Sequence, residues 1–185
     1  MAQAYDAIDF EKLHGLLLPF LPGEGRVLDV GAGSGRDARA LADRGLEVVA
    51  VEPSEGMRKE ASRHSPSPKI LWKDDALPDL ATIPDHPSFC LILVSAVWMH
   101  IPPDLRDRAL HRLSGLLLPG GHLYLTFRSV GNDPERGMAP VSLPDTLRSA
   151  NAGTLSLLVS TTSDDLLGRP GLTWSSLLFR KALPA

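Results

Sequence analysis

Residues 26–45 read R-V-L-D-V-G-A-G-S-G-R-D-A-R-A-L-A-D-R-G, and this stretch decides the fold. The apolar run over 27–30 predicts a short strand, and the alanine- and leucine-rich segment after the glycines predicts a helix that ends at a glycine. Gly31, Gly33 and Gly35 allow the backbone to turn sharply between the two elements. The helix N-terminus is thereby left open to a ligand that approaches the backbone closely.

The spacing of these glycines restricts the ligand. A phosphate-binding Walker loop needs Gly-Lys-Ser/Thr, and the loop contains no lysine. A dinucleotide fingerprint reads G-x-G-x-x-G, whereas this loop reads G-x-G-x-G with Asp29 just before it. A carboxylate there repels a pyrophosphate and attracts a cation. The ligand that fits is a nucleoside with a positively charged amino-acid tail, and S-adenosylmethionine has this chemistry.

A second acidic residue follows the next apolar run. Residues 46–51 are typical of a parallel strand covered on both faces, and Glu52 ends this run. A carboxylate at that place accepts hydrogen bonds from both hydroxyls of a ribose. Met57, in the helix that follows, is expected either beside an adenine ring or in the core.

Three motifs together resemble the class I S-adenosylmethionine-dependent methyltransferases. They are D-V-G-A-G-S-G at 29–35, V-V-A-V-E-P-S at 48–54 and L-L-L-P-G-G at 116–121. The resemblance implies a doubly wound α/β fold with a mostly parallel seven-stranded sheet and an antiparallel last strand. It also implies one methyltransferase domain over 1–185, which divides into an N-terminal lid helix (1–25), a cofactor-binding core (26–128) and a C-terminal helix and strand pair (129–185).

The resemblance implies S-adenosylmethionine as the cofactor and S-adenosylhomocysteine as its product. We expect Asp29 and the glycines to hold the methionine end, Glu52 the ribose, and Asp74 or Asp75 the adenine amino group. The expected cofactor contacts are Asp29, Gly31, Ala32, Gly33, Gly35, Glu52, Pro53, Met57, Asp74, Asp75, Ala76 and Ser95.

The segment S-A-V-W-M-H at 95–100 follows the most apolar predicted strand and lies over the crevice where ligands bind in such sheets. His100 is the candidate general base, or else a packing residue. Trp98 is expected as an apolar wall for the methyl acceptor, or as a core residue. Family members that methylate adenine or glutamine amino groups carry N/D-P-P-aromatic here, so S-A-V-W argues against those acceptors.

Two arginines are the other candidate acceptor contacts. Arg128 follows the predicted strand 122–127, whose alternation turns its side chain toward the crevice. An arginine there can hold a carboxylate or phosphate through two parallel hydrogen bonds. Arg136 is a second candidate, although it could instead pair with Asp133 or Glu135.

The ends of the chain have their own patterns. Apolar spacing over 2–21 predicts an amphipathic helix, in which Tyr5 and His14 either line the site or serve packing. A serine-capped helix is predicted over 142–151, and strands over 154–160 and 174–180.

Composition excludes several classes of protein. A net charge of −3 without a basic run gives no reason to expect a nucleic-acid partner. Cys90 is the only cysteine, which rules out an intrachain disulfide or a cysteine-based metal cluster, and we expect no metal. No apolar run approaches the length of a membrane span. We expect a cytoplasmic protein, either a monomer or a homodimer.

These patterns predict methyl transfer from S-adenosylmethionine to a small-molecule acceptor. One alternative is a regulatory or non-catalytic module of the same fold that binds the cofactor without turnover. Another is an NAD(P)-dependent oxidoreductase, which the glycine spacing and Asp29 disfavour.

Overall fold

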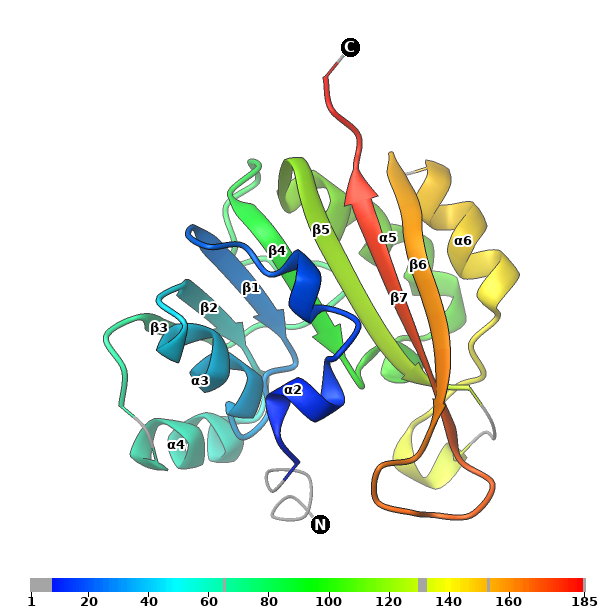
Figure 1. Ribbon diagram of the computed structural model, residues 1–185, viewed down its shortest axis with the longest axis horizontal. Coiled ribbons are helices and arrows are strands. Elements are labelled where there is room, and N and C mark those ends of the chain that lie inside the picture. The colour runs from blue at the N-terminus through cyan, green and yellow to red at the C-terminus, as the bar shows by residue number, and fades with distance from the viewer. Residues whose placement is uncertain (1–7, 65, 130–132, 153, 185) are drawn as a thin grey trace.

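The computed structural model describes residues 8–64, 66–129, 133–152 and 154–184. Helices and strands alternate through the first two thirds of this part of the chain, and two long strands end it (Figure 1). The helical elements are α2 (Phe10–Leu13), η1 (Leu18–Phe20), α3 (Arg36–Asp43), α4 (Glu55–His64), η2 (Trp98–His100), η3 (Pro103–Leu105), α5 (Arg106–Leu116), η4 (Pro134–Arg136) and α6 (Leu143–Ala152). The strands are β1 (Arg26–Val30), β2 (Glu47–Val51), β3 (Ile70–Lys73), β4 (Phe89–Ser95), β5 (Leu117–Arg128), β6 (Leu155–Asp164) and β7 (Thr173–Lys181).

The strands form one seven-stranded sheet in the order β3-β2-β1-β4-β5-β7-β6. Strands β1 to β5 are parallel to one another, whereas β7 is antiparallel to both β5 and β6. In Figure 1 the arrowhead of β7 accordingly points opposite to that of β5. This confirms the predicted mostly parallel sheet with an antiparallel last strand. The strand order reverses between β1 and β4, which is where ligands bind in doubly wound sheets.

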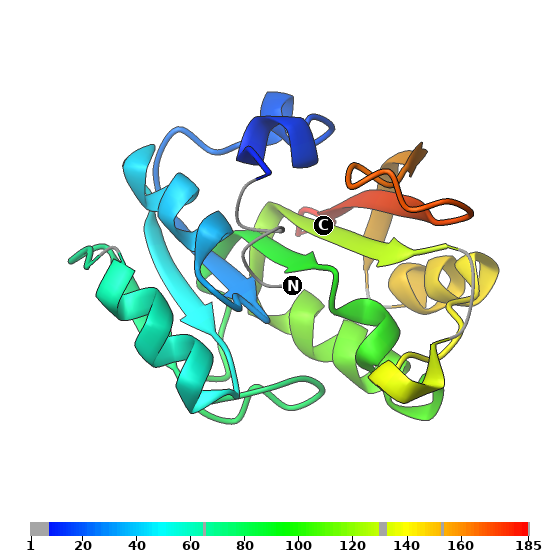
Figure 2. The ribbon, with the colours of Figure 1, turned by 90° about the horizontal axis from the view of Figure 1, so that it is seen from below.

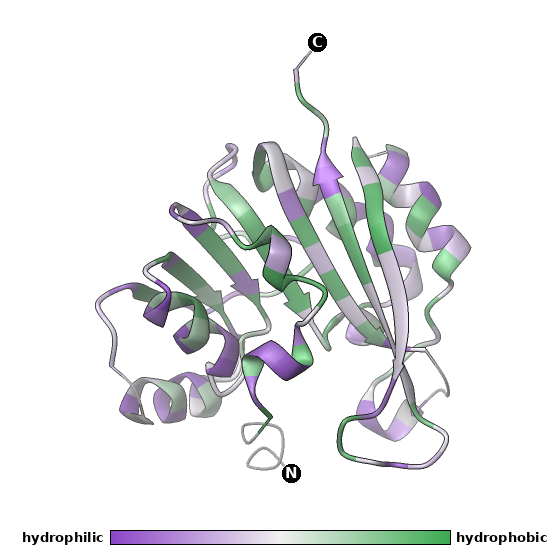
Figure 3. Ribbon diagram, in the orientation of Figure 1, coloured by the Kyte–Doolittle hydropathy of each residue, from purple (hydrophilic) through white to green (hydrophobic). Residues whose placement is uncertain are grey.

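Both faces of the sheet are covered, because alternate residues of its strands point to opposite sides. On one face Leu123, Leu125 and Phe127 of β5 belong to a core cluster that also includes residues of α5 and α6. On the other face Tyr124 belongs to a cluster with residues of α2 and α3. Figure 2 shows α2 on one side of the sheet and α5 and α6 on the other. In Figure 3, β2 and β4 are mainly hydrophobic, whereas the lower part of β6 is pale.

The N-terminal segment differs from its prediction. A continuous helix over 2–21 is wrong for the described residues, because only α2 and the short η1 are helical there, and residues 1–7, with Tyr5, lie outside the described residues. Asp9 begins α2 by accepting bonds from two backbone amides, and the helix ends at His14. Gly15 lowers helix stability at the break, and Pro19 starts a new turn at the beginning of η1.

Two strands are longer than their sequence patterns indicated. β5 begins at Leu117 rather than at 122, and β6 extends to Asp164 rather than to 160. Gly121 explains the first difference: a Cβ there would lie 2.9 Å from the carbonyl oxygen of Leu118 and 3.1 Å from that of Cys90, so only glycine lets the strands approach. β6 continues through serines and threonines, which suit an exposed edge strand but show little alternation.

Candidate cofactor and acceptor site

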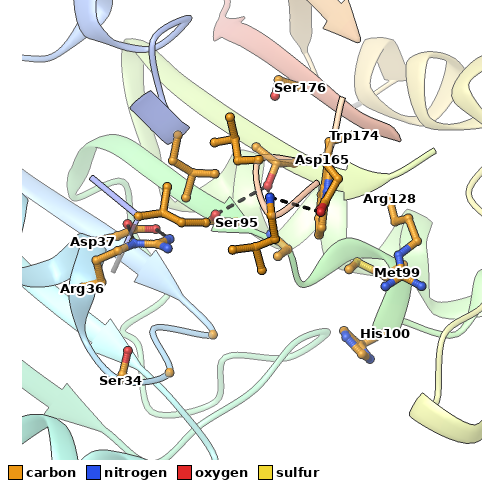
Figure 4. Close-up of a pocket in the computed structure, with 18 of the residues that line it drawn as sticks. Ser34, Arg36, Asp37, Ser95, Met99, His100, Arg128, Asp165, Trp174 and Ser176 are labelled. Atoms are coloured by element: carbon orange, nitrogen blue, oxygen red, sulfur yellow. Dashed lines mark hydrogen bonds and ion pairs between the residues drawn. The ribbon is translucent and has the colours of Figure 1, made fainter. Parts of the chain in front are cut away.

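A cavity of about 600 Å³ opens at the carboxyl ends of β1, β4 and β5, a volume suited to a small ligand. Figure 4 shows Arg36 and Asp37 at one end, Ser95 in the middle, and Met99, His100 and Arg128 at the other. We call the two ends the Asp37 end and the Arg128 end. The Asp37 end comprises Asp29, Gly31, Ala32, Gly33, Ser34, Arg36, Asp37 and Met57. The Arg128 end comprises Met99, His100, Arg128, Arg136, Met138 and Trp174.

The glycine loop at the Asp37 end depends on close packing. Gly31 has φ +72°, and a Cβ there would lie 2.3 Å from a methyl carbon of Val97, so no other residue fits. Gly33 has φ +54° and lies beside the end of the Met57 side chain. The backbone N–H of Gly33 donates to Oε2 of Glu52 at 3.0 Å, and that of Ser54 donates to Oε1 at 2.8 Å. Glu52 therefore fixes the loop, although it is not itself among the residues that line the cavity.

Asp29 is the most unusual group in the cavity. It is only 2% exposed, and its Oδ2 has no hydrogen-bond partner among the described residues. Burial raises the pKa of Asp29 well above its usual range; the negative charge of Asp37 adds to this rise, and Arg36 and the Ala38 backbone amide oppose it. A carboxylate held in this way gains most from a cation that enters the cavity.

Asp37 is held by two basic side chains. Its Oδ2 lies 3.0 Å from Nε2 of His14, and its Oδ1 accepts a 2.8 Å bond from Nε of Arg36. Burial alone would raise the pKa of Asp37, but the charge and hydrogen bond of His14, together with Arg36, hold that pKa well below its usual range. Asp37 is therefore a stable anion in the wall of the cavity.

The two acidic candidates for adenine binding lie outside the described lining of the cavity. Asp74 is exposed, and its Oδ2 accepts a 2.8 Å bond from Nη2 of Arg58. Asp75 accepts bonds from the backbone amides of Ala76, Ala81 and Thr82 and from the Thr82 hydroxyl. These bonds to the loop lower the pKa of Asp75, although burial acts in the opposite direction. Its carboxylate thus organises the segment 75–82.

A small polar cluster lies in the middle of the cavity. Ala96 has φ +58°, a conformation that a non-glycine residue adopts only when its surroundings hold it. Thr126 holds it twice: the Ala96 N–H donates to the Thr126 carbonyl at 3.1 Å and to its hydroxyl at 2.9 Å. The Thr126 hydroxyl donates in turn to Oγ of Ser95 at 3.5 Å. The ends of β4 and β5 are therefore fixed to each other at the point where the two halves of the cavity meet.

The Arg128 end is basic. The side chain of Arg128 is 7% exposed, and its Nη1 lies 3.7 Å from Oδ2 of Asp133. Nε of Arg128 is buried without a partner among the described residues. Nε of Arg136 lies 3.9 Å from the same Asp133 oxygen. His100 lines this end and is exposed.

The connection between β6 and β7 forms a wall of the cavity. Asp165, whose side chain is 3% exposed, accepts bonds from Nε of Arg169 at 2.9 Å and Nε1 of Trp174 at 2.9 Å. It also accepts from the backbone amides of Leu167 and Arg169. Hydrogen bonds from Arg169, more than the opposing effect of burial, hold the pKa of Asp165 well below its usual range. The hairpin tip is thereby a fixed structure, and Trp174 faces Arg128 across the β5–β7 pair.

Most of the predicted site residues meet in this cavity, and some do not. The lining contains Asp29, Gly31, Ala32, Gly33, Met57, Ser95, His100, Arg128 and Arg136. The residues outside it are Gly35, Glu52, Pro53, Asp74, Asp75, Ala76 and Trp98. Trp98 is fully buried in the core that includes α5 and α6, so the expectation that it walls the acceptor is corrected to its core alternative. Gly35 packs instead against the ring of Trp72, which a Cβ would approach to 3.0 Å.

Other residues that line the cavity were not predicted from the sequence. Asp37 and Arg36 follow the glycine motif directly, and their place in the first turn of the helix was an available signal. Met138 and Asp165 come from segments without periodicity, so nothing in their local sequence placed them near Arg128.

Known methyltransferases are similar to this chain in sequence or in fold. An uncharacterised methyltransferase of Mycobacterium tuberculosis is 35% identical to this chain over 105 residues. The match covers 56% of this chain and 40% of the relative. This chain thus spans less than half the length of that relative. An S-adenosylmethionine-dependent methyltransferase from Mesorhizobium loti is 18% identical with a TM-score of 0.74, covering 90% of this chain and 96% of the other.

A third similar protein was solved with ligands. The 1,6-didemethyltoxoflavin-N1-methyltransferase of Burkholderia thailandensis, with bound 1,6-didemethyltoxoflavin and S-adenosylhomocysteine, is 20% identical with a TM-score of 0.73. The alignment covers 91% of this chain and 76% of that one. The class of fold is therefore the doubly wound fold of S-adenosylmethionine-dependent methyltransferases. A family model described as a methyltransferase domain matches residues 27–121, just over half of the 185 residues, and the chain belongs to this family.

Two features are absent from the described residues. None of their helices has both the length and the apolar character needed to cross a bilayer. No group of three or more His, Cys, Asp or Glu side chains within 8–64, 66–129, 133–152 and 154–184 is arranged to hold a metal ion.

Proposed function

We propose that this chain binds S-adenosylmethionine at the Asp37 end of the cavity and transfers its methyl group to a small molecule at the Arg128 end. The observation that carries the proposal is the buried Asp29 carboxylate, whose Oδ2 has no partner among the described residues and lies beside the glycine loop. Such a group favours a ligand with a positive charge and disfavours a pyrophosphate. Membership of the methyltransferase family supports the same ligand.

Each part of the cofactor has candidate contacts. Asp29 faces the ammonium group of the methionine end. Glu52 keeps its remaining lone pairs for the ribose hydroxyls, since each of its oxygens accepts one backbone bond. Asp75 accepts four bonds within its own loop, which fills its capacity, so we assign the adenine amino group to Asp74.

Methyl transfer from a sulfonium requires the protein mainly to position the acceptor and the methyl group. S-adenosylmethionine supplies a methyl group on a sulfonium, so the acceptor forms a bond to carbon while the electron pair of the broken bond returns to sulfur. The Ser95–Thr126 cluster and the strained Ala96 fix the backbone between the two ends of the cavity. This rigidity holds the reacting atoms in line. His100, exposed at the Arg128 end, is the candidate base where the acceptor must lose a proton.

The shape of the Arg128 end supports a small acceptor. The hairpin tip at Asp165 and the segment at Met138 form part of its wall. The Burkholderia thailandensis protein, with its bound 1,6-didemethyltoxoflavin, has the same fold and accommodates a small molecule.

Calorimetric titration with S-adenosylhomocysteine tests the cofactor assignment. We expect the wild type to bind it and Glu52→Ala to bind at least about tenfold more weakly, since two charge-assisted contacts are lost. Glu47→Ala is the matched control, because Glu47 is an exposed glutamate at the opposite end of the same strand, and it should bind like the wild type.

Two results would overturn the assignment. Binding of NAD without binding of S-adenosylhomocysteine would make the chain an oxidoreductase. Binding of S-adenosylhomocysteine, with no methylated product from a broad metabolite screen, would favour the non-catalytic module.

A further inference from the structure

We propose that the methyl acceptor carries an anionic group, a carboxylate or a phosphate, on an apolar body, and that Arg128 binds this anion. The inference rests on the proposed function, because it takes the Arg128 end as the acceptor site. It adds the chemical class of the acceptor, which neither the fold nor the family defines.

The Arg128 guanidinium is buried without full pairing. The side chain is 7% exposed, and the acidic group closest to it among the described residues is Oδ2 of Asp133, 3.7 Å from Nη1. That separation exceeds hydrogen-bond length, and Nε has no partner among the described residues. A buried charge with unsatisfied donors is costly unless another anion completes it. Arg128 is itself one of the residues that line the cavity.

The acidic group beside Arg128 does not pair fully with it. One oxygen of Asp133 lies 3.7 Å from Nη1 of Arg128 and 3.9 Å from Nε of Arg136. Both separations exceed hydrogen-bond length, so this carboxylate does not satisfy the donors of Arg128. Of the other acidic groups near this end, Asp165 is neutralised by Arg169, and Asp164 is exposed to water, which screens it. The Arg128 end thus favours a ligand with a negative charge.

An apolar surface lies beside the arginine. Met99 is buried, Met138 and Trp174 are half-buried, and all three line the cavity beside Arg128. Figure 4 shows Met99 next to Arg128, with Trp174 on the side of the hairpin tip. Methionine and tryptophan side chains adapt to a flat or irregular apolar body. An acceptor with an apolar part and one anionic group matches both features.

The fork of a guanidinium suits both candidate anions. It makes two parallel bonds to a carboxylate or to a phosphate, and burial strengthens them. We therefore choose three probes with the same phenyl ring: benzoate, phenyl phosphate and the neutral benzamide. Each is titrated calorimetrically into the protein with and without saturating S-adenosylhomocysteine.

Three variants accompany the wild type. Arg128→Met removes the charge and keeps an apolar side chain of similar length, so it should fold. Asp133→Asn removes the competing carboxylate. Arg148→Met is the control, because Arg148 is an exposed arginine on α6 that pairs with Asp145 away from the cavity.

We expect benzoate or phenyl phosphate, but not benzamide, to bind the wild type and Arg148→Met. Arg128→Met should bind the anion at least about tenfold more weakly, whereas Asp133→Asn should bind it more tightly. A preference for benzoate identifies a carboxylate acceptor, and a preference for phenyl phosphate identifies a phosphate. Benzamide binding as tightly as benzoate, or equal anion binding by Arg128→Met, overturns the inference.

The design separates this inference from the proposed function. If S-adenosylhomocysteine binds and the anions do not, the acceptor class is wrong and the cofactor assignment stands. If the anions bind through Arg128 and S-adenosylhomocysteine does not, the anion site stands and the cofactor assignment fails.

Discussion

Nε2 of His14 lies 3.0 Å from Oδ2 of Asp37, and both residues are buried. The contact joins the N-terminal segment to the first turn of α3, where Asp37 also lines the cavity. The ring of His14 packs against Phe10 and Tyr124 with centroid distances of 4.8 and 5.4 Å. A residue of the N-terminal segment thus fixes a charged wall of the cavity.

We predict that His14→Ala strongly lowers the free energy of unfolding. The substitution removes one partner of a buried charged contact and two ring contacts, and leaves Asp37 with Arg36. Loss of one member of such a pair costs about 3–5 kcal/mol. Urea unfolding measures the change, and His111→Ala, at an exposed histidine of α5, should stay within about 0.5 kcal/mol of the wild type. A change below 1 kcal/mol for His14→Ala, on the scale of ordinary surface substitutions, would contradict the prediction.

The same contact predicts how stability depends on acid. The pKa of Asp37 is lower in the folded protein than in the unfolded chain, whose value is near 3.9. Its contribution is therefore present above about pH 4 and is lost as the pH falls toward the folded value. We expect the wild type to lose stability steeply in this range and His14→Ala to lose it less steeply. Urea unfolding at a series of pH values between 2 and 6 tests this; parallel curves would show that Asp37 does not depend on His14.

Asp29 is expected to change the stability of the fold with pH in the opposite direction to Asp37. Its pKa is raised in the folded protein, so it favours folding below the unfolded value and opposes it as the pH rises through the folded value. We predict that Asp29→Asn raises the Tm at neutral pH and weakens S-adenosylhomocysteine binding at least about tenfold, because the neutral amide has no charge for the ammonium. Asp43→Asn, at an exposed position of α3, should change neither quantity.

Binding should also displace a proton from Asp29. A cation beside this carboxylate lowers its pKa, so protein that holds the proton must release it. We expect the calorimetric binding enthalpy of the wild type to depend on the ionisation enthalpy of the buffer, and that of Asp29→Asn to lose this dependence. An equal dependence in both proteins would place the released proton elsewhere.

The parts that sequence predicted are those encoded within a few residues. The glycine loop is one, because its conformation depends on residues that allow positive φ, as at Gly31. The apolar strands are another, since burial on both faces requires continuous apolar runs such as β4. The order of the sheet then follows from connection rules shared by doubly wound proteins.

The parts that sequence missed depend on contacts between distant residues. His14 and Asp37 are 23 positions apart, and nothing in the sequence near either residue indicates its partner. Arg128 was expected at the cavity from alternation along its strand, but its incomplete pairing depends on the placement of Asp133 in a loop. Trp98 follows a buried strand whether it faces the ligand or the core, and only packing distinguishes the two.

Arg106 does not line the cavity, but it is expected to hold the segments that form the Arg128 end. Its guanidinium donates to the carbonyl oxygens of Ile101 at 3.0 Å and Pro140 at 2.7 Å, and the Ala139 N–H donates to that of Met99 at 2.8 Å. We predict that Arg106→Met weakens anion-probe binding several-fold, because Met138 is no longer held, and leaves S-adenosylhomocysteine binding unchanged. It should lower the free energy of unfolding by about 2 kcal/mol, since three carbonyls lose a charged donor. Equal losses for both ligands would mean general unfolding rather than local positioning.

Asp165 should have a similar local effect from the hairpin side. Its carboxylate binds Arg169, Trp174 and two backbone amides, so Asp165→Asn removes the charge and at least one bond while keeping the side-chain shape. We predict a loss of about 1–3 kcal/mol in the free energy of unfolding. Because the folded pKa of Asp165 is depressed, this difference should be full above about pH 4 and should shrink as the pH falls.

The binding readout distinguishes a wall of the acceptor site from a remote stabilising contact. If Asp165 holds Trp174 beside Arg128, Asp165→Asn weakens the anion probes several-fold and leaves S-adenosylhomocysteine binding intact, because the hairpin tip lies away from the glycine loop. Asp104→Asn, at an exposed aspartate of η3, should affect neither ligand. Unchanged probe affinity together with lower stability would show that the tip is structural and that the acceptor is bound without Trp174.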